Sequence, residues 1–200
     1  MATVNNHQHN SDHSTYTVNM HGSKITVTVT AFASIVENWI KTTFIFERED
    51  YEWRSLLTGI AVDPRADTLQ LCTGNRCLIF QLGHADSIPQ NLRDFLLNRH
   101  CGFIRFKNPM LRNMLKSSKH CLEIHRDPLD LSFYREEYDH DSVEEIIYKS
   151  LGLKVELREE IRMSNWSEEC LSDDQLAYAC VQTHCAYLMG YKLHSWVLCI

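Results

Sequence analysis

The chain has 200 residues, of which 44% are hydrophobic and 23% are charged. This length and composition are typical of one globular domain that buries a core. The formal net charge of −6 argues against a broad basic face that holds duplex DNA by charge alone, although it leaves room for a local basic groove. The sequence contains no apolar run of 18 residues, so no membrane span is predicted.

The first 14 residues are polar and rich in histidine. They lack the apolar centre of a secretory signal, and we expect residues 1–14 to be a disordered tail before a single domain over 15–200. His7, His9 and His13 are the possible metal ligands in this tail. The eight cysteines contain no Cys-x-x-Cys pair and lie in apolar stretches, which predicts reduced, buried thiols in a cytoplasmic, or alternatively nuclear, protein.

The first half of the chain predicts mostly strands. Residues 15–20 and 24–30 are rich in β-formers and flank a His-Gly-Ser turn, which indicates a hairpin. Apolar residues at helical spacing predict a helix over 31–41, followed by a polar loop over 42–54. A buried strand is expected over 56–62.

A second predicted hairpin and the segments after it complete the central part of the chain. Strands over 68–72 and 76–82 are joined by a tight turn that contains Gly74-Asn75. The spacing of Ser87 and Gln90 resembles a capping box and predicts a helix that ends at residue 98. A strand over 102–106, a short helix over 108–116 and a strand over 121–125 are then expected.

The last third of the chain predicts helices. An acidic loop over 127–141 precedes a helix that Asp141 or Ser142 caps and that ends at Gly152. A second capping box, from Ser172 to Gln175, opens the last long helix, which we expect to end near residue 193. The order of elements predicts an α/β fold with a mixed central sheet flanked by helices and an N-terminal β-hairpin.

Two segments carry a family resemblance. The hairpin over 69–82 and the stretch over 163–179, which includes Met-Ser-Asn-Trp and Asp-Gln-Leu-Ala-Tyr-Ala, resemble the DnaQ-like 3′–5′ exonuclease domain in its plant Werner-type branch. The resemblance implies the ribonuclease H-like fold. Within that branch the chain looks most like the small proteins that form homohexameric rings, the RISC-interacting clearing 3′–5′ exoribonucleases. That group is associated with Argonaute proteins, trims single-stranded RNA and has active sites at subunit interfaces.

Hydrolysis of a phosphodiester by two metal ions requires several carboxylates, because Mg²⁺ prefers oxygen ligands. In the family these are an Asp-x-Glu pair, a second Asp, and a Tyr followed four residues later by a third Asp. By resemblance, the first pair falls on Ala61 and Asp63, the second Asp near Pro109, and the last two on Tyr178 and Gln182. Asp63 is thus the predicted ligand for Mg²⁺ or Mn²⁺, and an ordinary two-metal site within one subunit is not expected.

The same alignment suggests roles for the remaining site residues. Asp63 and Tyr178 are the predicted catalytic residues, although Tyr178 alternatively fills the core. Arg65 and Gln182 are the predicted substrate-binding residues, with Arg65 gripping a phosphate or lying as an ordinary surface residue. Trp166 either stacks a base or anchors the packing.

Other acidic residues lie near the site in sequence. They are Asp67, Glu168, Glu169, Asp173, Asp174 and the Tyr-Asp-His-Asp loop over 138–141. Each is either an additional metal ligand or a structural group: helix N-termini favour acids such as Asp173 and Asp174, and the loop also suits a helix cap.

Two functions from different classes therefore remain. The first is a Mg²⁺-dependent 3′–5′ exoribonuclease for single-stranded RNA, including uridylated 5′ products of Argonaute cleavage, that works as a homohexamer with sites completed by neighbouring subunits. The second is a catalytically inactive protein of the exonuclease fold that binds nucleic acid or acts as a scaffold. The missing carboxylates favour the second, and the family's behaviour favours the first.

Overall fold

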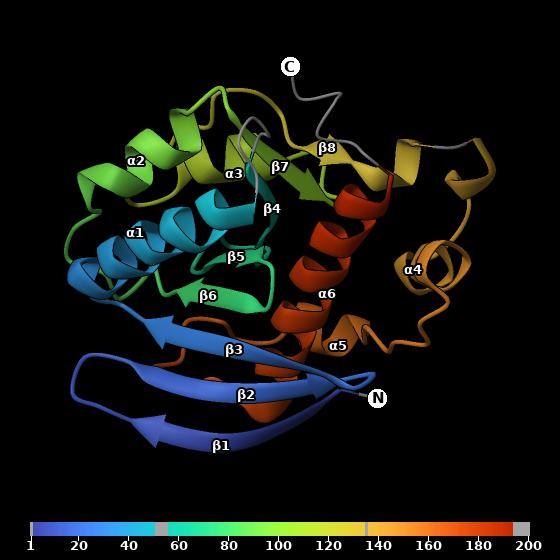
Figure 1. Ribbon diagram of the computed structural model, residues 1–200. Coiled ribbons are helices and arrows are strands. Elements are labelled where there is room, and N and C mark those ends of the chain that lie inside the picture. Colours follow the sequence, from blue (N-terminus) through green and yellow to red (C-terminus); the bar gives the residue numbers. More distant parts are fainter. Residues whose placement is uncertain (1, 51–55, 135, 194–200) are drawn as a thin grey trace.

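A computed structural model describes residues 2–50, 56–134 and 136–193. Within them, the strands form one mixed sheet in the order β1-β2-β3-β6-β5-β4-β7-β8 (Figure 1). The strands are β1 Thr3–His9, β2 Ser14–Met20, β3 Ser23–Thr30, β4 Leu56–Val62, β5 Leu69–Thr73, β6 Arg76–Phe80, β7 Cys101–Arg105 and β8 Leu129–Asp130. The pairs β3–β6, β4–β7 and β7–β8 are parallel, and the other neighbours are antiparallel.

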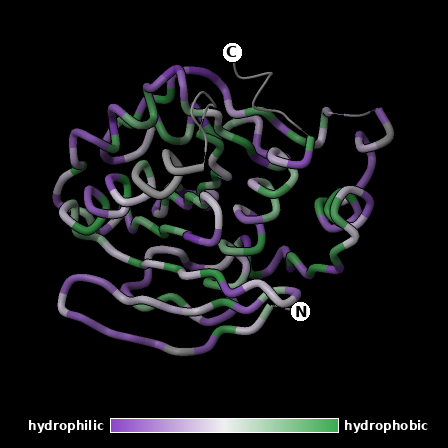
Figure 2. Tube along the Cα trace, viewed as in Figure 1, coloured by the Kyte–Doolittle hydropathy of each residue, from purple (hydrophilic) through white to green (hydrophobic). Residues whose placement is uncertain are grey.

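Helices cover both faces of the sheet. The helices are α1 Ala33–Asp50, α2 Gln90–Leu97, α3 Leu111–Ser117, α4 Val143–Leu151, α5 Glu159–Arg162 and α6 Asp173–Lys192, with short 3₁₀ turns η1 Leu131–Phe133 and η2 Glu136–Tyr138. One apolar core lies between the sheet and α1, α2 and α3, and a second lies between the sheet and α4 and α6. Hydrophobic residues concentrate where these helices face the strands (Figure 2). Strand alternation produces both cores, since Leu78 and Phe80 face the first and Ile79 faces the second.

Several predicted elements are confirmed. The first hairpin appears as β2 and β3, the strand over 56–62 as β4, and the second hairpin as β5 and β6. Capping boxes are present at both Ser142 and Ser172, and Gly152 ends α4 in the left-handed conformation. The cysteines in the described residues are free thiols, but the prediction that they are buried is wrong for Cys121 and Cys170, which are exposed. In these same parts of the chain, no helix has the length and apolar character needed to span a membrane.

The predicted disordered tail over 1–14 is wrong for most of its length. Residues Thr3–His9 form β1, which pairs with β2 along an antiparallel ladder. The ring of His7 stacks on that of Tyr16 at a centroid distance of 4.4 Å. The ladder satisfies the backbone groups of a polar segment, which explains why hydrophobic periodicity gave no signal for it. That residues 15–200 form a single domain stays a prediction.

Other boundaries also differ from the predictions. Helix α1 continues to Asp50, so the loop expected over 42–54 is wrong for 42–50; residues 51–54 lie outside the described residues. Helix α2 begins at Gln90 after Pro89, which forms no side-chain cap, so the predicted box at Ser87 is absent. Residues 121–125 form no strand, and the strand beside β7 is β8 instead. Cys121 has a φ of 49°, which is incompatible with extended pairing.

Helix α6 lies directly on β4 because Gly59 has no side chain. A Cβ atom at Gly59 would stand 1.9 Å from the backbone oxygen of Thr183. The glycine therefore permits a close approach between the helix and strand backbones. This approach places the face of α6 that carries residues 178 and 182 against the end of β4.

Candidate active site

Asp63 follows the last residue of β4 and closes the turn toward β5. Its Oδ1 accepts hydrogen bonds from the Thr68 backbone N at 2.6 Å and from the Thr68 hydroxyl at 3.0 Å, and its Oδ2 accepts one from the Arg65 backbone N at 3.0 Å. The residue is 3% exposed, and burial raises the pKa of its carboxyl group despite these hydrogen bonds. Asp63 therefore has a structural role in the 63–68 turn.

A cavity of about 210 Å³ brings three of the sequence-predicted residues together. Asp63, Tyr178 and Gln182 all line it, with the last two one turn apart on α6. Burial raises the pKa of Tyr178 to about 12, so the phenol stays protonated at neutral pH and can donate a hydrogen bond. Tyr178 thus joins this cavity rather than only filling the core.

Arg65 lies outside this cavity. It lines a neighbouring one of about 380 Å³, together with Met163, and Asp63 lines both. The guanidinium is largely exposed, pairs with Asp67 across 3.2 Å and donates to the Asn165 side chain. Arg65 therefore joins the 63–68 turn to the loop that precedes α6, where it remains accessible to a ligand.

Sequence reasoning missed several polar residues of the first cavity. Gln70, Lys107, Asn108 and Arg162 also line it. Lys107 and Asn108 follow β7, and parallel pairing of β4 with β7 brings the carboxyl ends of both strands to one edge. Gln70 lies directly opposite Ala61 in the β4–β5 register. The predicted hairpin contained this signal, because cross-strand partners share a face.

A buried ion pair fixes the segment that carries Lys107. Asp130 Oδ2 pairs with Arg105 Nη1 at 2.5 Å, and its Oδ1 accepts from the Lys107 backbone N at 3.0 Å. Ser132 donates both its backbone N and its hydroxyl to the same carboxylate oxygen. Because these donors satisfy the buried Asp130 carboxylate, the ion pair holds the Lys107 segment at the edge of the cavity.

The chain by itself does not fit a pair of metal ions. Among the described residues, Asp63 is the one carboxylate in the lining of the cavity, and Ala61 and Gln182 supply none. Both lone pairs of Asp63 Oδ1 are used, which leaves a single acceptor position on Oδ2. Across residues 2–50, 56–134 and 136–193, no group of three or more histidine, cysteine or acidic residues is arranged to hold a metal. That one subunit lacks an ordinary two-metal site stays a prediction.

Two of the other acidic residues are engaged in structural contacts. Asp174 pairs with Arg158 at 2.7 Å, and Asp141 pairs with Lys149 at 2.6 Å. Ser142, and not Asp141, caps α4. These contacts favour the structural interpretations of the helix N-terminus and of the 138–141 loop.

Trp166 is a packing anchor. It is 2% exposed, and its Nε1 donates to the Arg162 backbone oxygen at 3.1 Å. Its ring contacts that of Tyr178 edge-on, with centroids 6.3 Å apart. A buried indole with a satisfied N–H supports the wall of the cavity and has no free face for a base.

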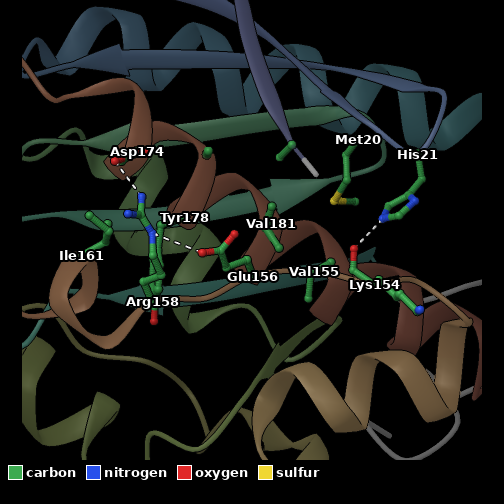
Figure 3. A pocket seen from close by; sticks show the side chains of 12 residues that line it. Met20, His21, Lys154, Val155, Glu156, Arg158, Ile161, Asp174, Tyr178 and Val181 are labelled. Atoms are coloured by element: carbon green, nitrogen blue, oxygen red, sulfur yellow. Dashed lines mark hydrogen bonds and ion pairs between the residues drawn. The ribbon is translucent and has the colours of Figure 1, made fainter.

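Tyr178 also lines a third cavity (Figure 3). Its volume of about 70 Å³ is small, and ion pairs from Arg158 to Asp174 and Glu156 cross its wall. His21 closes another side through a hydrogen bond to the Lys154 backbone oxygen at 2.9 Å. At about 30 Å³ for each water molecule, this space suits solvent rather than a nucleotide.

Comparison with known proteins identifies the fold. No family model and no curated protein sequence matches the chain. Among solved structures, the EXO domain of Aedes aegypti Nibbler aligns with a TM-score of 0.63 at 12% identity, covering 85% of this chain and 88% of that one. The EXD2 exonuclease domain soaked in Mn and Mg aligns with a TM-score of 0.47 at 20% identity, covering 86% of this chain and 92% of that one.

The chain therefore has the DnaQ-like 3′–5′ exonuclease fold, as the resemblance predicted. In this fold the central strand order is β6-β5-β4-β7-β8, α6 packs against β4, and β1–β3 extend the sheet. At this level of identity the likeness defines the fold alone.

Proposed function

We propose that the chain is a 3′–5′ exoribonuclease for single-stranded RNA whose active sites are completed across subunit interfaces. One observation carries the proposal: Asp63, Tyr178 and Gln182 meet in a single cavity at the carboxyl end of β4, in a chain with the exonuclease fold. The net charge of −6 argues against a broad electrostatic grip on a duplex and so favours a single strand.

The residues of this cavity have separate roles in the proposal. Tyr178 donates a hydrogen bond to the bound strand or to the attacking water. Lys107 brings a positive charge, and its ammonium group already donates to the Asp141 backbone oxygen. Gln182 contacts substrate through its amide, and Arg65 binds a phosphate of the next nucleotide in the adjoining cavity. Asp63 contributes its one remaining acceptor position.

The metal ions, Mg²⁺ or Mn²⁺, require carboxylates beyond those of one chain. In the proposal a neighbouring subunit of a homohexameric ring supplies them. The family resemblance further suggests Argonaute proteins as partners, uridylated 5′ cleavage products as substrates, and a cytoplasmic or nuclear location.

A second candidate function is a nucleic-acid-binding or scaffold protein without catalysis. The hydrogen bonds of Asp63 favour it, because three donors from the 63–68 turn explain the presence of this carboxylate without any metal. This candidate keeps the cavity and its ligand but has no hydrolytic step.

A nuclease time course on defined oligomers distinguishes the two functions. Size-exclusion chromatography with light scattering separates ring from monomer, and each fraction receives 5′-labelled single-stranded RNA with Mg²⁺, Mn²⁺ or chelator. The enzyme proposal expects a stepwise ladder from the ring fraction that chelator abolishes. Tyr178→Phe, which removes only the hydroxyl, is expected to slow the ladder about 10²-fold, in the range for a positioned proton donor.

Three outcomes have definite meanings. A ladder that requires metal and ring supports the exoribonuclease. RNA that binds but stays intact at every metal concentration overturns it in favour of the binding protein. RNA that neither binds nor shortens overturns both candidates.

A further inference from the structure

The carbonyl group of Gln70 is an unpartnered acceptor inside the cavity. Gln70 lies between Leu69 and Leu71, which face the core under α1 and α2, so its own side chain projects to the α6 side. It is 2% exposed and lines the cavity with Asp63 and Tyr178. Within the part of the chain that the structure describes, no group donates to its Oε1.

A hydrogen-bond chain fixes the orientation of this amide. The Thr68 hydroxyl donates to Asp63 Oδ1 at 3.0 Å, so its oxygen is left as an acceptor. The Gln70 Nε2 donates to that oxygen at 3.1 Å. A flipped amide would place two acceptors together, so the amide N is the end that meets Thr68 and the carbonyl is the end without a partner among the described residues.

The small residue opposite makes room for this amide. Ala61 pairs with Gln70 across the strands, and it lies between Ile60 and Val62, which face the other core. Ala61 and Gln70 therefore share the face toward α6. Where the family resemblance places a carboxylate, the chain has a methyl group and a neighbouring carboxamide that accepts but carries no charge.

A buried acceptor of this kind selects a ligand that brings a donor. A phosphate diester offers only acceptors, so it does not satisfy Gln70. Base edges offer donors, but these differ in position from base to base, and an enzyme that shortens a strand stepwise meets every base. The hydroxyl groups of ribose are donors that each RNA nucleotide presents in the same place.

We infer that Gln70 Oε1 accepts a hydrogen bond from a ribose hydroxyl of the 3′-terminal nucleotide, and so makes Gln70 a specificity-determining residue for that sugar. The inference rests on the proposed function, because it takes the cavity to be the seat of an RNA 3′ end. A contact to the 2′-hydroxyl discriminates RNA from DNA, whereas a contact to the 3′-hydroxyl discriminates a free end from a blocked one.

Fluorescence anisotropy with 5′-labelled oligouridylates in chelator measures this contact without cleavage. The ligands are all-ribose RNA and the same RNA with a terminal 2′-deoxy or 3′-deoxy residue. The wild-type protein is expected to lose about tenfold in affinity for one of the two deoxy ligands, which corresponds to the cost of leaving a buried acceptor unpaired. Gln70→Met, of similar length without an acceptor, is expected to bind all three ligands equally.

Gln90→Met on exposed α2 is the matched control and is expected to discriminate like the wild type. If circular dichroism shows that Gln70→Met does not fold, Gln70→Leu takes its place. In either case, the ligand series with the wild-type protein tests whether a ribose hydroxyl is recognised. RNA binding without discrimination between the ligands overturns the Gln70 contact but leaves the proposed function standing. Discrimination that persists in the folded Gln70 variant also overturns the contact, and failure of every RNA to bind overturns both.

Discussion

Replacement of Asp63 by alanine is expected to destabilise the fold, whatever it does to activity. The change leaves the Thr68 backbone N, which is fully buried, without an acceptor, at a cost of about 1–3 kcal/mol. The bonds from the Thr68 hydroxyl and the Arg65 N contribute about 1–2 kcal/mol more. Ala66 lies in the same turn with a φ of 57°, so the turn holds a residue in a conformation that alanine disfavours.

The predicted loss for Asp63→Ala is therefore about 2–5 kcal/mol in the free energy of unfolding, measured by urea titration with circular dichroism. Asp63→Asn keeps an oxygen for both Thr68 donors and loses only the bond to the Arg65 N, so we expect a loss of about 1–2 kcal/mol. An Asp63→Ala protein within 0.5 kcal/mol of wild type would refute the structural role of this carboxylate. Activity lost in Asp63→Ala reports on chemistry only if the variant is shown to be folded.

Three further predictions concern stability. Gly59→Ala is expected to cost about 3 kcal/mol, because its Cβ would meet the Thr183 backbone oxygen at 1.9 Å; an unchanged thermal midpoint would contradict the close helix–strand approach. Asp130→Ala is expected to cost about 3–5 kcal/mol in urea unfolding, since it leaves Arg105 buried without its partner, and a loss below 1 kcal/mol would argue against the pair. Because the pKa of the Asp63 carboxyl group is raised, the folded state binds its proton more tightly than the unfolded state does. The stability of the wild type should therefore fall relative to Asp63→Asn as the pH rises from the ordinary aspartate pKa through the raised one. Parallel stability–pH profiles of the two proteins would contradict this prediction.

Local signals in the sequence were sufficient for elements whose physics is local. The capping box at Ser172 predicted the start of α6, because side-chain bonds within three residues decide it. Strand β1 gave no such signal, since its polar residues gain order only from the ladder with β2. The strand expected over 121–125 was wrong, because an apolar composition does not reveal a backbone at positive φ such as that of Cys121.

The candidate site was predictable where a family pattern marks it. Asp63, Tyr178 and Gln182 were identified from spacing and resemblance, and the fold brings all three to one cavity. Gln70 was missed because its role depends on facing Ala61 across two strands, which is a property of register rather than of sequence spacing. The partnership of Arg105 with Asp130 was missed for the same reason, since strand pairing, not proximity in the chain, brings the two together.

The turn after β4 affects how proteins of this fold can be classified as active or inactive. A carboxylate that only bound metal could be replaced by other residues once hydrolysis was no longer under selection. Asp63 is constrained in another way, because its carboxylate oxygens accept the hydrogen bonds that hold the turn leading to β5. A protein of this fold that no longer hydrolysed its substrate would still need an acid at this position for its stability. An acid at this position in a related sequence therefore reports on the structure of the turn and is not a marker of nuclease activity.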